Sequence, residues 1–136
     1  MNVETLNGLT LAYIGDSYYE LYIRNYLVSK GYQKVNMLHN LAVDYTSGKA
    51  QAEFIHYLMN NNILDEKEIN VFKHGRNAHI ASHRKNIDIQ TYLDGTGFEA
   101  LMGYYYLTGN DIRFKEIMEI LIKHKEEEVS INGCEK

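Results

Sequence analysis

The chain has 136 residues, a formal net charge of −4 and 45% apolar residues, values typical of one globular domain with a full core. No apolar run approaches the roughly 20 residues of a membrane-spanning helix, and the opening MNVETLNG lacks the features of a secretory signal. The net acidity argues against a protein that coats nucleic acid through overall charge. The single cysteine, Cys134, cannot form an internal disulfide or build a metal site alone, which indicates a reduced, cytoplasmic protein. Because no apolar run is long enough to span a bilayer, no membrane partner is expected.

Apolar residues at helical spacing predict four helices in the N-terminal half of the chain. Gly31 ends the first helix, because glycine tolerates the left-handed cap conformation. Asn36 is expected to cap the second helix, and Asp65 forms a capping box with Glu68 at the start of the fourth. The predicted ranges are 9–29, 37–46, 49–60 and 66–75.

The C-terminal half begins with a polar, aperiodic segment over 76–87. A turn is predicted at Asp94-Gly95, and Gly109 is predicted to end the helix that follows it. No segment alternates with a period of two, so no strand is expected. The fold class is therefore an all-α bundle of six or seven helices, with one domain over 1–128 and a disordered tail over 129–136. The remaining predicted helices cover 88–93, 96–107 and 111–128.

Two predicted helices are apolar on nearly every side, yet both contain carboxylates. The first helix carries Asp16 and Glu20, which share a face because they are four residues apart, and a later helix carries Glu99. Helices that are apolar all round lie in the interior of a protein. Gly15 and Gly103 accompany these acids, although a glycine inside a helix costs about 1 kcal/mol relative to alanine. Close approach of two helix backbones would explain both glycines.

Three explanations account for acids in such helices, because a bare buried carboxylate is unfavourable. Tyrosine hydroxyls or Arg24 can satisfy each acid separately. Neighbouring carboxylates can instead raise one pKa and so produce a general acid. A divalent cation such as Mg²⁺ can also lie between the two helices, since it takes oxygen ligands and often only one or two carboxylates. Asp16 and Glu99 would suffice for this third arrangement.

A basic segment interrupts the acidic chain. No Asp or Glu occurs from Ile69 to Ile87. A solvated loop is one interpretation of this segment, and a patch that binds phosphates is the other. The candidate phosphate-binding residues are Lys73, Arg76, Arg84 and Lys85.

Together these features resemble the ribonuclease III family. YIGDSYYELYIRNYL resembles the family's signature helix, TGFEALMGYYYL resembles its second acidic helix, and SGKAQA resembles the start of its lysine-bearing helix. The similarity is greatest to the short Mini-ribonuclease III branch, which has the catalytic domain without a separate domain for binding double-stranded RNA. The segment HGRNAHIASHRKN resembles that branch's basic loop. The resemblance covers about residues 5–125 and implies a ribonuclease III-like endonuclease domain.

The resemblance also implies roles for individual residues. Asp16 and Glu99 match the family's metal-binding acids, and Lys49 matches a lysine near the scissile phosphate. Glu20 matches an acid of the signature helix and is expected to act behind Asp16 or as a structural partner. The residues expected to bind RNA are Lys73, Arg76, Arg84 and Lys85.

The implied activity is hydrolysis of phosphodiesters in double-stranded RNA with Mg²⁺, or alternatively Mn²⁺, as cofactor. The implied substrate is the precursor of large-subunit (23S) ribosomal RNA, and a ribosomal protein is a further candidate partner. A homodimer is expected because one site cuts one strand. The predicted helices over 9–29 and 96–107 carry tyrosines that could form the dimer face or belong to the core, namely Tyr18, Tyr19 and Tyr105.

Other classes of protein remain open from the sequence. Two positions that are acidic in longer members of the family are Ala12 and Thr96 here, as in the short branch, and they would favour a catalytically weak RNA-binding protein of the same fold. If the protein is active, waters or RNA phosphate oxygens would complete the metal's ligands. A different all-α metal phosphohydrolase and a purely structural bundle are the further alternatives.

Overall fold

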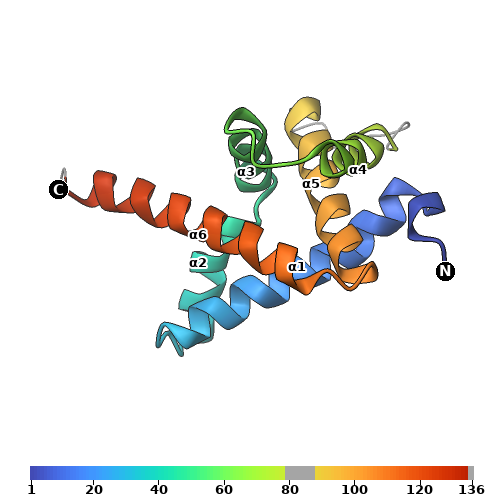
Figure 1. The fold of residues 1–136 in the computed structure, drawn as a ribbon. Helices are drawn as coiled ribbons and strands as arrows, with labels where there is room; N and C mark the ends of the chain where they lie inside the picture. Colours follow the sequence, from blue (N-terminus) through green and yellow to red (C-terminus); the bar gives the residue numbers. More distant parts are fainter. Residues whose placement is uncertain (79–87, 135–136) are drawn as a thin grey trace.

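The computed structural model describes residues 1–78 and 88–134, and this part of the chain forms six α-helices (Figure 1). A single-turn 3₁₀ helix over Val3–Thr5 precedes them. The described residues contain no strand, which confirms the all-α prediction, and no helix among them has the length and apolarity to cross a membrane. The helices are α1 (Gly8–Ser29), α2 (Val35–Thr46), α3 (Gly48–Asn60), α4 (Glu66–Asn77), α5 (Ile89–Leu107) and α6 (Asp111–Cys134).

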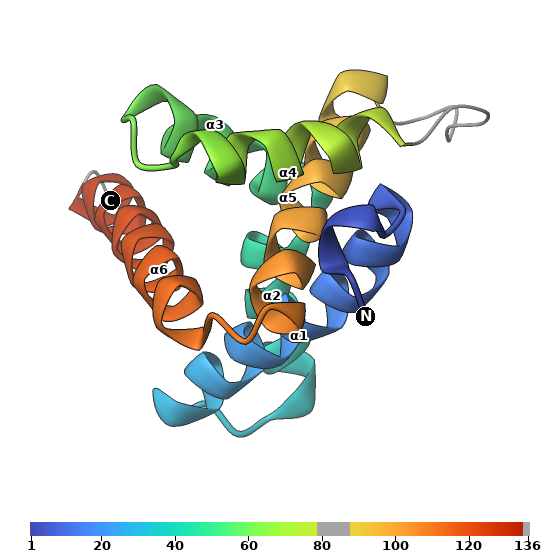
Figure 2. The same ribbon diagram turned by 45° about the vertical axis from the view of Figure 1, so that its right-hand side comes forward.

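Helix α5 is the central element. Helices α1, α3 and α4 each make their most extensive helix contacts with it, and Figure 2 shows α4 across its upper part and α1 across its lower part. Phe98, Leu101 and Met102 of α5 are fully buried, and the ring of Tyr19 from α1 meets Phe98 edge to face at 5.0 Å. Because neighbouring helices surround α5, its sequence is apolar on nearly every side.

Helices α1 and α5 cross at two glycines. A Cβ atom added at Gly15 would overlap the backbone carbonyl oxygen of Glu99, and one added at Gly103 would overlap the carbonyl oxygen of Leu11. The expectation that these glycines allow two helix backbones to approach closely is confirmed. The crossing also brings the residue after Gly15, which is Asp16, to the helix that carries Glu99.

A buried ion pair joins α4 to α6. Arg113 donates hydrogen bonds from Nε and Nη2 to the two carboxylate oxygens of Glu68, at 2.7 and 2.9 Å, and the hydroxyl of Tyr105 donates to the same carboxylate. The backbone N–H of Asp65 donates to Glu68 at 2.9 Å, which completes the predicted capping box. Burial alone would raise the pKa of Glu68, but these hydrogen bonds lower it below its usual value. The ion pair therefore holds three helices together in its charged form.

The predicted turn at Asp94-Gly95 is wrong, because α5 runs through both residues without a break. Asp94 does not cap a backbone N–H but is buried, with hydrogen bonds to the side chains of Gln90 and His56. Gly95 faces the start of α3, where an added Cβ would lie 3.3 Å from the side-chain oxygen of Gln51 and 3.8 Å from the Cα of Gly48. Glycine here serves close packing between helices, a role that sequence alone does not distinguish from a turn.

Two other helix boundaries differ from the predicted ones. Helix α4 continues past Gly75, because that glycine packs against α5 and an added Cβ would overlap the side chain of Ala100. Helix α2 begins at Val35, two residues before its predicted start, so the predicted cap Asn36 lies inside the helix. The observed cap residue, Lys34, makes no side-chain hydrogen bond to the helix. The predicted ends at Gly31 and Gly109 are confirmed, and both have positive φ, as the cap requires.

Helix α6 continues beyond its predicted end. The charged run over 125–128 consists of residues that favour helix, and the backbone remains helical through Cys134, within the segment expected to form a disordered tail. The assignment of residues 1–128 to the catalytic domain stays a prediction.

Candidate active site

The α1–α5 crossing brings Asp16 and Glu99 together, as the sequence predicted. Asp16 is on the exposed side of α1, whereas Glu99 of α5 is partly buried. Burial, a hydrogen bond to the Asp16 carboxylate and the charge of Asp16 raise the pKa of Glu99 to about 9, and the charge of Glu20 contributes in the same direction. Without a cation, Glu99 therefore keeps its proton near neutral pH.

Gln51 of α3 is a further polar residue of the site, and the sequence analysis missed it. Its side chain is buried, and its amide forms a hydrogen bond with Glu99 that favours the charged carboxylate. A signal was available, because Gln51 interrupts an otherwise apolar face of α3 that includes Ala50, Phe54 and Ile55. Three helices thus contribute side chains to the site: α1, α3 and α5.

Lys49 lies in the first turn of α3, beside the same part of α5. Ser47 caps this helix by accepting a hydrogen bond from the backbone N–H of Ala50 at 3.1 Å. Gly48 packs next to Gly95, which precedes Glu99 by one helical turn. The Lys49 side chain is exposed. The start of α3, which carries the exposed side chain of Lys49, therefore lies about one helical turn of α5 away from Glu99.

Glu20 forms an ion pair with Arg24 one turn along α1, with 3.3 Å between Oε1 and Nη2. Both side chains are more than one third exposed, so the pair contributes little to stability. The interpretation that Arg24 satisfies an acid therefore applies to Glu20. Asp16 and Glu99 have no such arginine among the hydrogen bonds and ion pairs of the described residues.

Ala12 and Thr96 occupy the positions where longer members of the family that the sequence resembles have acids. Ala12 is buried next to Leu11 and Ala100, and its methyl group contributes to a small apolar cluster. Thr96 is also buried, and its hydroxyl donates to the carbonyl oxygen of Tyr92 at 3.1 Å. Neither position supplies a carboxylate, so the charge of the site comes from Asp16 and Glu99, with Glu20 nearby.

The predicted RNA-binding residues fall into two groups. Lys73 and Arg76 lie on α4, whose end packs at Gly75 against the backbone of α5 immediately before Phe98. Lys73 is exposed, and the guanidinium of Arg76 lies 5.4 Å from the centre of the Phe72 ring. The other two predicted contacts, Arg84 and Lys85, lie outside the described residues.

The two carboxyl groups suit a hard divalent cation better than a metal that prefers nitrogen or sulfur ligands. The described residues contain no group of three or more His, Cys, Asp or Glu side chains that could hold a metal ion. Mg²⁺ needs no such cage, because it usually binds through one or two carboxylates and retains several waters. The raised pKa of Glu99 shows that its charged form is unfavourable beside Asp16, and a bound cation would stabilise that charged form. The donor set of Asp16, Glu99 and Gln51 therefore fits Mg²⁺ with water ligands.

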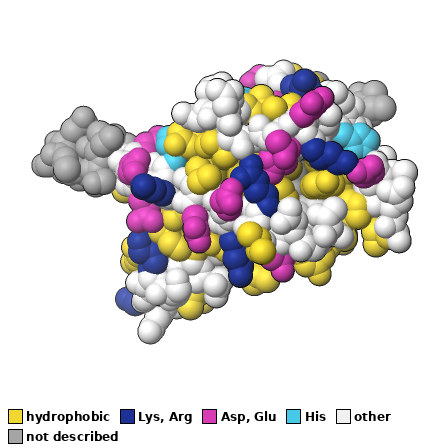
Figure 3. Space-filling model, in the orientation of Figure 1, with side chains coloured by type: hydrophobic (Ala, Val, Ile, Leu, Met, Phe, Trp, Pro, Cys, Tyr) yellow, Lys and Arg dark blue, Asp and Glu magenta, His cyan; other side chains and the backbone are white. Residues whose placement is uncertain are grey.

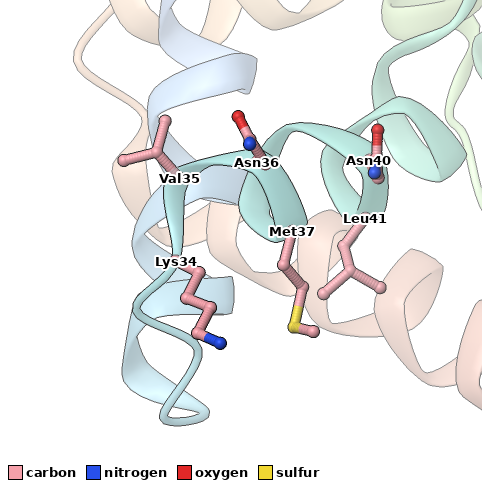
Figure 4. A pocket seen from close by; sticks show the side chains of 6 residues that line it. All are labelled: Lys34, Val35, Asn36, Met37, Asn40 and Leu41. Atoms are coloured by element: carbon pink, nitrogen blue, oxygen red, sulfur yellow. The ribbon is translucent and has the colours of Figure 1, made fainter.

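A wide surface hollow lies away from this site. It has a volume of about 680 Å³ and lies at the start of α2, where Figure 4 shows Met37 and Leu41 on one side of the helix. It includes a single cation, Lys34, and no carboxylate. On the face shown in Figure 3, acidic and basic side chains are interspersed.

Comparisons with known proteins agree with this arrangement. A family model described as "Ribonuclease III domain" matches residues 9–110. A protein named Mini-ribonuclease 3 from Enterococcus faecalis is 48% identical over 118 residues, which cover 87% of this chain and 89% of that protein. The Mini-ribonuclease 3 of Streptococcus pneumoniae is 41% identical over 126 residues, which cover 93% and 98% of the two chains.

A solved structure shares the fold. The crystal structure of a protein from Fusobacterium nucleatum superposes with a TM-score of 0.77 at 29% sequence identity. The alignment covers 88% of this chain and 94% of that chain. The overall arrangement of the helices thus recurs in an experimentally determined structure.

Proposed function

The chain belongs to the ribonuclease III family and is an endoribonuclease for double-stranded RNA, and from this premise we propose that Asp16 and Glu99 hold Mg²⁺ to process ribosomal RNA precursor. The observation that carries this proposal is the meeting of these two carboxyl groups at the α1–α5 crossing, with Gln51 bonded to Glu99. Mn²⁺, which also takes oxygen ligands, is the alternative cofactor.

When bound, the cation lowers the pKa of a water ligand and offsets charge that develops on the scissile phosphate. Asp16 and Glu99 orient it by their carboxylate oxygens. Gln51 donates to Glu99 and so favours the ionised carboxylate that a cation requires. Glu20 acts behind Asp16, where its pair with Arg24 limits the excess negative charge. The exposed ammonium of Lys49 contacts the phosphate as a point charge.

The RNA duplex is held by its backbone, because the deep major groove of A-form RNA is inaccessible to side chains. Lys73 and Arg76 at the end of α4 are proposed to contact phosphates, together with Arg84 and Lys85 from the following segment. The acidic chain offers few other cations near the site, so its affinity for RNA should fall steeply as salt rises.

We also propose a homodimer, which is typical of the family, because each site cuts one strand of the duplex. The tyrosines considered for its interface do not suit that role. Tyr19 and Tyr105 are fully buried, and Tyr18 packs against Phe114, with 4.0 Å between ring centres. These side chains belong to the core of one subunit.

The better candidate for the dimer face is the exposed side of α1 and α2. This side continues from Asp16 and includes a groove of about 310 Å³ between the two helices, bordered by Glu20 and Arg24. Several apolar side chains on it are exposed, Tyr13 reaching 81%, and a group of exposed apolar side chains is typical of an interface. The exposed apolar residues are Leu9, Tyr13, Leu21, Val28, Val35 and Val43.

The proposed substrate is the precursor of 23S ribosomal RNA, and the matched relatives are bacterial proteins. A ribosomal protein bound to that precursor could present the duplex, since this chain has few cations of its own for RNA contact. The cytoplasm, where bacterial ribosomal RNA is made, is the location that follows from this substrate. The family model and the named relatives favour the enzyme over the alternative of a catalytically weak RNA-binding protein, although Ala12 and Thr96 contribute no acid to the site.

The deciding experiment is cleavage of a labelled RNA duplex with Mg²⁺ at low salt, compared with the same reaction in EDTA and with the Asp16→Asn variant. We expect cuts only in the wild-type reaction with Mg²⁺, and a loss of at least about 100-fold in the variant. Full Mg²⁺-dependent cleavage by Asp16→Asn would overturn the assignment of this residue. Tight binding of the duplex without cleavage by the wild type would select the RNA-binding alternative.

A further inference from the structure

His56 and Asp94 form a polar pair that the proposed mechanism does not use. Nε2 of His56, on α3, lies 2.8 Å from Oδ2 of Asp94, on α5. The other carboxylate oxygen of Asp94 accepts a hydrogen bond from the side chain of Gln90 at 3.0 Å. The Asp94 side chain is 4% exposed, whereas that of His56 is 52% exposed. A buried carboxylate thus anchors an imidazole whose other edge is open to solvent.

The pair fixes which nitrogen of the ring is available. A buried carboxylate accepts hydrogen bonds, so Nε2 of His56 carries the proton that points to Asp94. Among the described residues, Nδ1 has no hydrogen-bond partner. Nδ1 can accept a hydrogen bond from a 2′-hydroxyl when the ring is neutral, or donate one to a phosphate oxygen when the ring is protonated. Both groups belong to the ribose–phosphate backbone of RNA.

The position of His56 relative to Lys49 suits a backbone contact. Residues seven apart on a helix share a face, and at 1.5 Å per residue they lie about 10 Å apart along the axis. Both side chains are exposed. Glu53 is exposed between them and would repel phosphate, so the two side chains would contact separate parts of the RNA backbone on either side of it.

We propose that His56 binds the ribose–phosphate backbone of the RNA substrate, and that Asp94 is its positioning residue. This inference rests on the proposed RNA-cleaving function and adds a contact beyond the active site and the basic segment. An ordinary structural link between α3 and α5 would use the Asp94 hydrogen bond equally well. A purely structural link would leave the exposed Nδ1 of His56 without a function. Removing the imidazole would then leave RNA binding unchanged, whereas our proposal predicts weaker binding.

The test compares His56→Gln with Lys115→Gln, which removes an exposed cation of α6 at a distance from the site. Duplex RNA is titrated at several salt concentrations between about 50 and 200 mM, in Ca²⁺ to prevent cleavage, and kcat and KM are measured separately in Mg²⁺. For His56→Gln we expect a dissociation constant and a KM raised on the order of fivefold, with kcat nearly unchanged. Lys115→Gln should match the wild type.

Two further variants separate the sources of the contact. If His56 binds phosphate, the slope of log affinity against log salt concentration should become shallower by about one in His56→Gln. The slope should return to its wild-type value in His56→Lys. If it binds the 2′-hydroxyl, wild type and His56→Gln should bind a 2′-deoxy-substituted duplex equally. Asp94→Asn should raise KM in the same direction while the melting temperature shows that the fold is retained.

Equal KM, equal affinity and equal salt dependence in wild type and His56→Gln would overturn the inference. An affinity loss that merely follows a lowered melting temperature would do the same, because it would indicate a structural link only. Failure of the wild type to cleave any duplex would instead count against the proposed function, so the two failures are distinguishable.

Discussion

Gly15 of α1 lies directly against the backbone carbonyl of Glu99 on α5, with no room for a Cβ atom between them. This contact fixes the separation of the two helices at the point where their carboxyl groups meet. The neighbouring residue Asp16 and the side chain of Glu99 are therefore positioned by backbone packing as well as by their own interactions.

Gly15→Ala should force the two helices apart. The methyl group would meet backbone, which cannot yield as a flexible side chain can, so we expect a loss of at least about 3 kcal/mol in unfolding free energy. Any folded fraction should cleave RNA poorly, because the carboxyl groups would separate. Urea denaturation and cleavage assays measure both effects.

The matched control is Gly48→Ala. No atom lies within 4 Å of a Cβ added there, at the start of α3. This variant should be as stable as the wild type, or more stable by up to about 1 kcal/mol through reduced backbone entropy. Equal stabilities of the two alanine variants would contradict the close contact between α1 and α5.

The stability of the metal-free protein should fall as pH rises above neutrality. Burial and Asp16 raise the pKa of Glu99 to about 9 in the folded state, against an ordinary value of 4.5. Between these values the folded protein binds a proton that the unfolded chain has lost, so the unfolding free energy decreases with rising pH. Urea denaturation in EDTA at about pH 6 and about pH 8.5 measures this decrease.

Glu99→Gln provides the comparison, because an amide of the same size does not titrate. This variant should lose less stability between the two pH values than the wild type, although it should not cleave RNA. Millimolar Mg²⁺ should stabilise the wild type at the higher pH and leave the variant unchanged, since a ligand stabilises only the state that binds it. Identical pH dependence in both proteins would show that Glu99 ionises normally.

Leu21→Glu should dissociate the proposed homodimer. Its side chain is 67% exposed on the α1 side that we assign to the interface, and a buried unpaired carboxylate there would be unfavourable. Light scattering at micromolar concentration should report a dimer for the wild type and a monomer for the variant. The monomer should nick one strand of a duplex and produce fewer double-strand cuts.

Ile112→Glu is the control for this experiment. Ile112 is 83% exposed at the start of α6, outside the proposed interface, so the charge there should leave the dimer intact. A monomeric wild type, or a Leu21→Glu variant that remains dimeric, would remove α1 and α2 from consideration as the interface.

Much of the fold was predictable because helix periodicity and capping are local properties. The capping box of Asp65 and Glu68 and the positive-φ ends at Gly31 and Gly109 depend on a few adjacent residues, and all are present as predicted. Glycines at helix crossings were harder to interpret. Gly75 and Gly95 have the same local signature as a helix end, but each contacts a helix distant in sequence.

The sequence by itself determined the helical composition, the two acidic helices and the residue types available for a hard cation. Apolar residues surrounding Asp16 and Glu99 indicated that these acids lie near other helices, and the neighbouring glycines indicated a close crossing. These conclusions needed only periodicity and the unfavourable energy of a buried charge.

Only the tertiary structure decided which side chains share the site. The crossing of α1 and α5 raises the pKa of Glu99, the packing of α3 adds Gln51, and the burial of Tyr19 excludes it from a dimer face. The same packing orients His56 through Asp94. Such contacts join residues far apart in the chain, and they depend on how the helices pack together rather than on the local sequence.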